Sequence, residues 1–193
     1  MEKIIKLAIE EHKVGIDFLF SNIEKIKEIA LLFIKTLKKG GKIIFIGNGG
    51  SASDAQHLSA ELVGRFKIDR KPLPAISLSS NISSLTALGN DFGFETIFEK
   101  QIQALGNKKD LLIGISTSGN SKNIISAIQA AKKIGMKTVG FLGRDGGALK
   151  NLVDVSFVVP IDDTARIQEI HILLGHIICE IIDQQYAKIS HSK

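Results

Sequence analysis

Residues 43–65 read IIFIGNGGSASDAQHLSAELVGR and combine an apolar run, a glycine-rich turn and a segment of mixed polarity. The β-branched and aromatic residues 43–46 predict a buried strand. Three glycines between positions 47 and 50 permit positive φ angles and let a ligand approach the backbone closely. The segment behind them predicts a helix capped by the side chain of Ser51 or Ser53. A strand, a glycine turn and a helix N-terminus in this order suit an anionic or sugar ligand.

His57 and Glu61 follow this turn at positions i and i+4, so they share one face of the predicted helix. An imidazole and a carboxylate behind a glycine turn could form one wall of an active site. Glycine-rich turns also occur without any ligand, and the two side chains could be a surface pair on a solvated helix. Both interpretations stay open on this stretch alone.

A second turn of this kind lies at residues 116–121, STSGNS, between the apolar run 110–115 and a helix predicted over 121–135. It carries four hydroxyl groups in six residues at a helix N-terminus, where backbone N–H groups lack intrahelical acceptors. We interpret it as a phosphate cradle that uses hydroxyls and backbone dipoles in place of a lysine. The alternative is a cap and turn rich in Ser and Thr, but one hydroxyl would suffice for a cap.

A third stretch lies in a long helix predicted from residue 162 to about residue 188. Gln168, Ile172 and His176 advance in steps of four, so Gln168 and His176 lie near one face, two turns apart. These polar groups interrupt an otherwise apolar helix. They could instead be satisfied core groups or a surface stripe, and that alternative is strongest for His171.

Predicted strands alternate with predicted helices along the chain, which indicates an α/β fold with a parallel sheet. About five strands flanked by helices fit a flavodoxin-like order, in which ligands bind at the carboxyl ends of the strands. The expected strands are residues 43–46, 75–78, 110–115, 137–142 and 154–159. Helices are also predicted over 79–88 and 94–105, on either side of the sequence GNDFG.

Two extra helices are predicted before the first strand, over residues 2–20 and 21–39. Ser21 and Glu24 form an S-x-x-E capping-box pattern at the start of the second. A doubly wound sheet does not need these helices, and their apolar faces require something to pack on. We therefore expect residues 1–193 to form a single domain, with the helical pair 1–40 used in oligomerisation.

Composition excludes several classes of protein. The net charge is +5, from 25 Lys and Arg against 20 Asp and Glu, and no basic stripe with interleaved aromatic residues favours nucleic-acid binding. No apolar run is long enough to span a membrane, and the N-terminal residues show no signal-peptide pattern. The single cysteine, Cys179, follows two isoleucines and is expected to be a packed thiol. A lone cysteine fits a reducing compartment, so we expect a cytoplasmic protein.

Four stretches together resemble the sugar isomerase (SIS) domain, and within it the bacterial phosphoheptose isomerases. GNGGSASDAQHLSAEL, GNDFGFE, GISTSGNS and ARIQEIH stand in that family's order, and the resemblance covers nearly the whole chain. It implies an aldose–ketose isomerase that converts sedoheptulose 7-phosphate to D-glycero-D-manno-heptose 7-phosphate. This reaction begins the synthesis of nucleotide-activated heptose for lipopolysaccharide or other surface glycans. The resemblance also implies a homotetramer.

The resemblance assigns residues to three roles. It implies Glu61 and His176 as the catalytic pair, without deciding which is base and which is acid. It implies a zinc ion held by these two residues together with His57 and Gln168; two imidazoles and a carboxylate suit zinc, whereas a glutamine oxygen is an unusual ligand. The implied substrate-binding residues are Asn48, Gly49, Gly50, Glu61, Asn90, Asp91, Ser116, Thr117, Ser118, Ser121 and Gln168.

A non-catalytic relative is the main alternative, because some SIS proteins that resemble this chain bind a replication initiator instead. Those relatives look as if they have lost the residues that match Glu61 and His176, and this chain keeps both. A phosphosugar-sensing transcription regulator would need a DNA-binding module, for which 193 residues leave no room.

Overall fold

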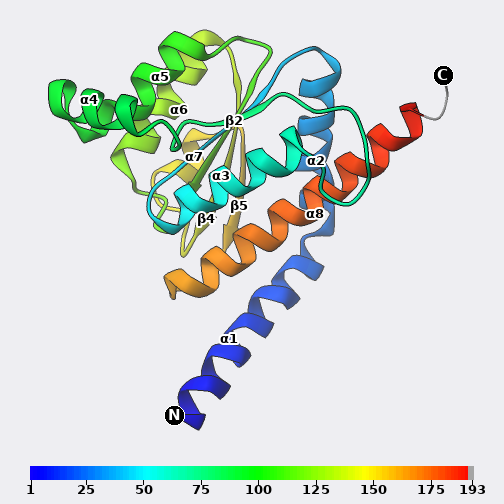
Figure 1. The fold of residues 1–193 in the computed structure, drawn as a ribbon. Coiled ribbons are helices and arrows are strands. Elements are labelled where there is room, and N and C mark those ends of the chain that lie inside the picture. The colour runs from blue at the N-terminus through cyan, green and yellow to red at the C-terminus, as the bar shows by residue number, and fades with distance from the viewer. Residues whose placement is uncertain (191–193) are drawn as a thin grey trace.

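A five-stranded parallel sheet with helices on both faces forms the centre of the protein in a computed structural model (Figure 1). The structure describes the backbone of residues 1–190 and the side chains of residues 1–187. The strand order is β2-β1-β3-β4-β5, which confirms the predicted flavodoxin-like α/β fold. No helix in the described residues is both long and apolar enough to cross a membrane.

The elements follow the predicted alternation. The strands are β1 (Ile43–Gly47), β2 (Ala75–Ser77), β3 (Leu111–Ser116), β4 (Lys137–Gly143) and β5 (Val155–Val159). The helices are α1 (Glu2–Ser21), α2 (Ile23–Lys38), α3 (Gly50–Val63), α4 (Ile82–Phe92), α5 (Ile97–Leu105), α6 (Lys122–Ile134), α7 (Leu149–Leu152) and α8 (Thr164–Ser190), with a 3-10 turn, η1, at Phe94–Thr96.

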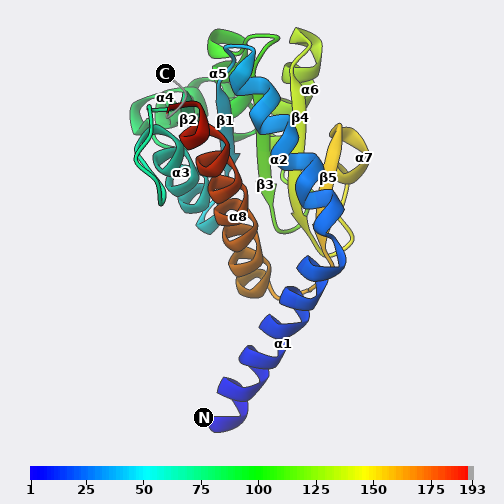
Figure 2. The same cartoon turned by 90° about the vertical axis from the view of Figure 1, so that its right-hand side faces the viewer.

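The alternation of side chains along each buried strand divides the core in two. Phe45 and Ile113 lie on one face of the sheet, in a cluster with residues of α2, α3 and α8. Ile44 and Leu112 lie on the other face, in a cluster with residues of α5, α6 and α7. Figure 2 shows α2 and α8 in front of the strands, with α6 and α7 behind or beside them.

The strand order places two polar turns next to each other. β1 and β3 are neighbours, and Gly47 at the end of β1 pairs with Ile115 near the end of β3. The chain leaves β1 toward one side and β3 toward the other, so the order of the strands reverses direction here. Such a switch point opens a crevice at the carboxyl ends of the strands, which is where α/β folds bind ligands.

Several predicted helix boundaries are wrong for local reasons. Ser21 does not cap α2, because its hydroxyl donates to the Asp17 carbonyl and Asn22 is the N-cap, with no side-chain hydrogen bond. α3 is likewise not capped by a serine, because it starts directly from Gly49. α4 begins later than predicted, at Ile82, after the N-cap Asn81, whose side chain accepts from Ser84 N. It then runs through residues 89–92, so GNDF is helical rather than a turn.

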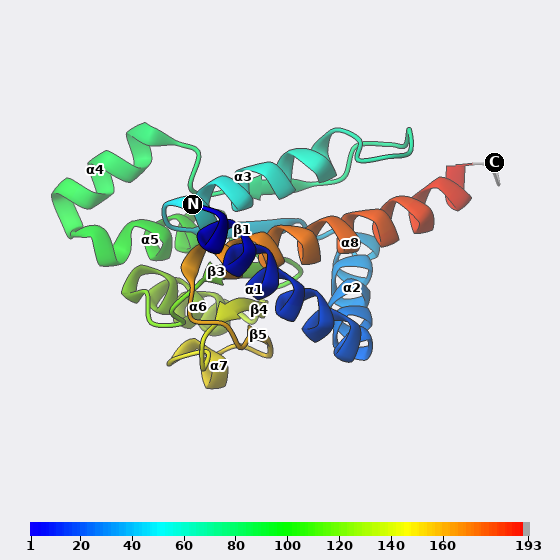
Figure 3. The ribbon, with the colours of Figure 1, turned by 90° about the horizontal axis from the view of Figure 1, so that it is seen from below.

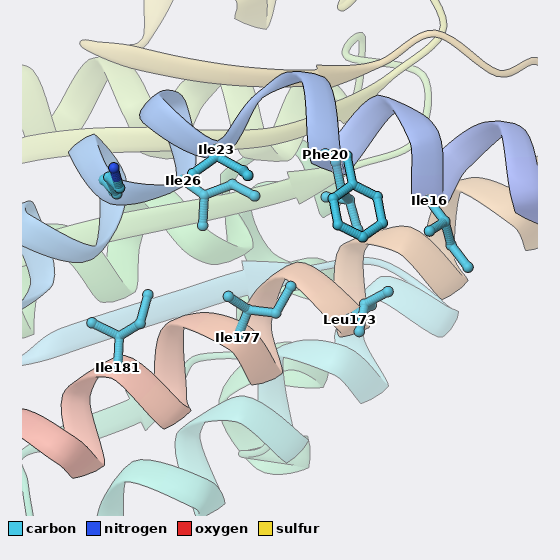
Figure 4. A pocket seen from close by; sticks show the side chains of 9 residues that line it. Ile16, Phe20, Ile23, Ile26, Leu173, Ile177 and Ile181 are labelled. Carbon is cyan, nitrogen blue, oxygen red and sulfur yellow. The ribbon is translucent and has the colours of Figure 1, made fainter.

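α1 extends away from the sheet, and its free end carries the N-terminus (Figures 1 and 2). Of its residues only Gly15 and Leu19 are buried, although Ile4, Ile5 and Leu7 are among its exposed apolar side chains. An apolar groove lies between the junction of α1 with α2 and one side of α8 (Figure 4). It is lined by Ile16, Leu19, Phe20, Ile23, Ile26, Lys27, Leu173, Ile177 and Ile181.

Candidate active site

The glycine turn after β1 brings two helices into close contact. Gly49 has φ 55°, a conformation that favours glycine, and α3 begins at the next residue. A Cβ atom at Gly50 would lie 2.6 Å from Gln168 Nε2 of α8. Glycine at position 50 therefore lets the Gln168 amide lie against the first turn of α3, so two of the predicted substrate-binding residues are adjacent.

Asn48 joins this turn to the second polar turn. Its side-chain amide and that of Asn123 exchange two hydrogen bonds, at 2.9 and 2.8 Å. Asn123 is buried in the first turn of α6, directly after Ser121 and Lys122. The sequence offers no signal for Asn123, because its partner lies 75 residues away and contact requires the β1–β3 pairing.

The second turn arranges its hydroxyls around the start of α6. Ser116 Oγ lies 3.1 Å from Ser121 Oγ and accepts a hydrogen bond from Gly119 N at 3.1 Å. Asn120 N donates to Ser118 Oγ at 3.2 Å. Ser121 is the N-cap residue of α6 but makes no capping hydrogen bond through its side chain. The turn is therefore more than a helix cap, and the N-terminal end of α6 and its hydroxyls can receive an anion.

His57, Glu61 and His176 form one cluster on α3 and α8 of the same chain. His57 Nε2 lies 2.9 Å from His176 Nε2 and 3.2 Å from Glu61 Oε1. One ligand atom from each residue lies within 4.8 Å of the others. His57 and His176 lie 119 residues apart, so their spacing along the chain does not predict that they meet.

This cluster fits a zinc ion by chemistry and by spacing. Two imidazole nitrogens and a carboxylate oxygen are ligands that zinc prefers, and bonds of about 2.1 Å in tetrahedral geometry put ligand atoms about 3.4 Å apart. The separations of 2.9 and 3.2 Å from His57 Nε2 are close to that spacing. Gln168 is the fourth implied ligand, and its amide lies against Gly50, nearly two turns along α3 from His57.

Burial and neighbouring charges shift the pKa values of His176, in the cluster, and of Asp54, close to it. Partial burial lowers the pKa of His176, and His57 lowers it further, while Glu61 acts in the opposite direction. This favours the neutral imidazole that can accept a proton or bind a metal. Burial raises the pKa of Asp54, one turn before His57, to about 6, and His57 moderates this rise. Among the described residues, Asp54 Oδ2 is buried without a hydrogen-bond partner.

Asn90 and Asp91 stand apart from the other predicted site residues. Both are exposed on α4, and Asn90 Nδ2 donates to Asp91 Oδ1 at 2.8 Å. The described hydrogen bonds join neither residue to the two polar turns or to the metal cluster. The element that follows α4 does reach the second polar turn: Glu95 of η1 forms an ion pair with Lys122, the first residue of α6.

Arg70 is a structural residue of the site that sequence reasoning missed. It is buried and donates to the carbonyl groups of Glu61 and Leu62 at the end of α3. Its Nε atom also donates to Asp183 Oδ1 of α8 at 2.7 Å. Arg70 therefore ties the C-terminal end of α3 to α8. No motif marks it, because a loop arginine is normally exposed.

Two remaining residues of α8 are buried in the core. His171 Nε2 lies 3.0 Å from the Leu142 carbonyl oxygen, and burial lowers the pKa of His171 to about 4. This supports the core alternative for His171. Cys179 is 2% exposed, and burial raises the pKa of its thiol to about 12, which confirms the predicted packed thiol.

Comparisons with known proteins agree with this geometry. The model of the SIS domain family matches residues 16–143. A phosphoheptose isomerase of Helicobacter pylori is 57% identical over 164 residues, which cover 85% of each chain. The structure of a phosphoheptose isomerase from Francisella tularensis aligns with TM-score 0.90 and 40% identity, covering 95% of this chain and 97% of that one. That of a phosphoheptose isomerase from Neisseria gonorrhoeae aligns with TM-score 0.88 and 42% identity, covering 95% and 98%.

The family match, the full-length structural agreement and the cluster of His57, Glu61 and His176 lead to one conclusion. The chain belongs to the SIS domain family and, within it, to the phosphoheptose isomerases.

Proposed function

We propose that this protein is an aldose–ketose isomerase that converts sedoheptulose 7-phosphate to D-glycero-D-manno-heptose 7-phosphate. The observation that carries the proposal is the cluster of Glu61, His57 and His176, which lies on α3 and α8 about two helical turns from the polar turn at the carboxyl end of β1. Relatives at 57% identity that are phosphoheptose isomerases support this substrate. No relative among those compared favours the alternative, a non-catalytic partner of a replication initiator.

The reaction moves a carbonyl group from C2 to C1. A base removes a proton from C1 while the C2 carbonyl oxygen gains one, which gives an enediol; a proton then returns to C2 as the C1 hydroxyl loses its own. We assign Glu61 as the base and His176 as the partner acid, because a carboxylate and an imidazole are suited to proton transfer near neutral pH. Both lie next to His57 Nε2, Glu61 on α3 and His176 on α8, and this closeness supports their acting on the same substrate carbons.

The turn at residues 116–121 binds the phosphate in this proposal. Ser116, Thr117, Ser118 and Ser121 offer hydroxyl groups, and the start of α6 offers backbone N–H groups with the favourable end of the helix dipole. The sugar is contacted from the turn after β1 by Asn48, Gly49 and Gly50, and from α8 by Gln168. Asn90 and Asp91 would complete the site from α4.

Zinc is the proposed cofactor, one ion for each subunit. His57, Glu61 and His176 would hold it, and Gln168 is the proposed fourth ligand. When bound, zinc supplies a Lewis acid that polarises the carbonyl group of the substrate. The lowered pKa of His176 supports metal binding, because the unprotonated imidazole is the ligand form, so in this proposal His176 serves as ligand and as acid in turn.

A homotetramer is the proposed assembly, with residues 1–40 as its helical centre. The groove of Figure 4 lies between α1, α2 and α8, and α1 carries further exposed apolar side chains. Contiguous apolar surfaces of this kind mark interaction sites. A second copy is the occupant that fits, because α1 projects an apolar stripe of its own beyond the fold.

We further propose that the protein works in the cytoplasm, at the start of nucleotide-activated heptose synthesis for lipopolysaccharide or another surface glycan. The buried, reduced Cys179 suits that compartment.

A panel assay tests the proposed activity. Purified protein is incubated separately with sedoheptulose 7-phosphate, fructose 6-phosphate and ribulose 5-phosphate, and aldose formation is followed. We expect kcat/KM to be highest for the heptulose phosphate by at least tenfold. Equal turnover of all three substrates, or none of the first, would contradict the proposed substrate.

A further inference from the structure

The two helices that carry the metal cluster approach each other closely at Gly175 of α8. A Cβ atom at this position would lie 2.6 Å from Leu58 Cδ1 and 3.0 Å from Leu58 Cγ, and closer still to Cδ2. Carbon atoms in van der Waals contact lie about 3.5–4.0 Å apart, so any side chain here would overlap Leu58. Leu58 is 1% exposed, and because protein interiors are close-packed, moving its side chain would displace its neighbours. The observed spacing of α3 and α8 at this level therefore requires glycine.

This contact is adjacent to the cluster on both helices. Leu58 directly follows His57, and Gly175 directly precedes His176. The two Nε2 atoms of these histidines lie 2.9 Å apart. A local separation of α3 from α8 at Leu58 would increase that distance.

Contacts on either side keep the helices from separating as rigid bodies. Gln168, seven residues before Gly175, lies against Gly50 at the start of α3. Asp183, eight residues after Gly175, is bound by Arg70, which also holds the carbonyl groups at the end of α3. Figures 1 and 3 show α3 and α8 side by side between these contacts. An added methyl group at position 175 would therefore displace the neighbouring residues locally.

We propose that Gly175 is a positioning residue for the isomerase: its missing side chain, matched to Leu58, sets the distance between His57 and His176. The inference rests on the proposed function. Gly175 has no side chain to bind substrate or metal and acts through the packing of α8 on Leu58. Because alanine has the higher helix propensity, a loss of function on substitution would come from the overlap and not from the helix itself.

Gly175→Ala is the direct test. We expect kcat to fall about 100-fold, the effect of displacing a catalytic group by about 1 Å. KM should stay within about threefold, because the proposed phosphate contacts belong to the separate turn at residues 116–121 before α6. The dissociation constant for Co²⁺, a spectroscopic substitute for zinc, should rise at least about tenfold by visible absorption titration.

A second substitution tests the mechanism. Leu58→Ala removes Cγ, Cδ1 and Cδ2, the three atoms that a Cβ at position 175 would meet. Gly175→Ala combined with Leu58→Ala should fold and should recover kcat and Co²⁺ affinity to near those of Leu58→Ala alone. The double variant should behave in this way even if Gly175→Ala alone is too unstable to purify, because removal of the Leu58 side chain relieves the overlap.

Gly106→Ala is the matched control. Gly106 is the C-cap of α5, and a Cβ there would lie 2.7 Å from the Ile102 carbonyl oxygen and 2.9 Å from Met136 Sδ, an overlap before β3, at the end of the sheet opposite the polar turns. It should lower the thermal unfolding temperature yet keep kcat and Co²⁺ affinity within about threefold.

Three results would overturn the positioning role. They are unchanged Co²⁺ affinity in Gly175→Ala, no recovery in the double variant, or an equal loss of kcat in Gly106→Ala. If instead the proposed function is wrong, the wild type will bind Co²⁺ but will not isomerise the sugar phosphate. The Co²⁺ affinities of the variants would still decide the role of Gly175.

Discussion

Ser121 is the residue at which the phosphate assignment can be tested most simply. Its hydroxyl lies 3.1 Å from that of Ser116 and makes no helix-capping bond, so it is available to a ligand. A hydrogen bond to a charged group contributes about 1.5–3 kcal/mol, so Ser121→Ala should weaken heptulose phosphate binding by roughly ten- to a hundredfold. Calorimetric titration measures this.

Ser126→Ala, on the same helix beyond the turn, is the control and should bind as the wild type does. Unchanged affinity in both Ser121→Ala and Thr117→Ala would show that this turn does not bind the phosphate.

His171 makes stability depend on pH. Burial lowers its pKa to about 4 in the folded protein, from the ordinary histidine value of about 6.5. Between these values the unfolded chain binds a proton that the folded protein does not. The stabilising contribution of neutral His171 is therefore complete above about pH 6.5 and is lost as the pH falls toward 4, by up to about 3 kcal/mol.

Urea unfolding of the wild type and of His171→Gln between pH 4 and 7 tests this. The wild type should lose more stability on acidification than the variant. The raised pKa of Asp54 acts in the opposite direction, because its folded state takes up the proton first, but it is common to both proteins and cancels in the comparison. Parallel pH curves would show that His171 does not titrate in this way.

At the scale of elements, α3 and α8 together form the proposed metal site. Because each helix supplies part of the cluster, neither His57 nor His176 alone should hold zinc. Protein prepared without chelator should contain about one zinc per subunit by mass spectrometry. His57→Ala should abolish this content.

His12→Ala is the matched control for zinc, because His12 also lies beside a glutamate, Glu169, at 2.7 Å, but belongs to no described three-residue cluster. It should retain the metal. Zinc bound equally by both variants, or full activity in metal-free wild type, would contradict the assigned site.

The sequence predicts elements and turns better than the contacts between them. Strand positions and the two polar turns follow from apolar runs ended by glycine or hydroxyl residues, and these were predicted correctly. The helix caps of α2 and α3 were not, since Ser21 bonds backward to Asp17 and Gly49 needs no side chain. A pattern such as S-x-x-E does not show whether the serine caps the next helix or bonds to the backbone of the preceding one.

Long-range contacts escape sequence reasoning for a different reason. Asn48 with Asn123, and Arg70 with Asp183, meet only once the sheet and α8 have formed. The close packing at Gly175 is similar: a glycine inside a helix is visible in the sequence, but its partner Leu58 is not. Site residues implied by the family resemblance, such as Asn90 and Asp91, remain predictions.

The whole molecule exposes an apolar surface that a monomer would leave in water. Phe20 is 71% exposed and lines the groove between α1, α2 and α8. Burial of this surface against other copies should produce a homotetramer at micromolar concentration, measured by light scattering. Phe20→Asp should shift the protein to smaller species.

Leu105→Asp, an equally apolar but separate exposed site on α5, should leave the assembly unchanged. A wild type that scatters as a monomer would contradict the tetramer.

Proton transfer by Glu61 is the central claim. Sedoheptulose 7-phosphate is incubated in D₂O with the wild type, with Glu61→Gln and with the control Glu180→Gln, whose carboxylate pairs with Lys67 on the surface of α8. The wild type and Glu180→Gln should form aldose with deuterium at C2, whereas Glu61→Gln should fold and bind substrate but lose turnover by about three orders of magnitude. Near wild-type turnover in Glu61→Gln, with deuterium still entering at C2, would show that Glu61 does not carry the proton.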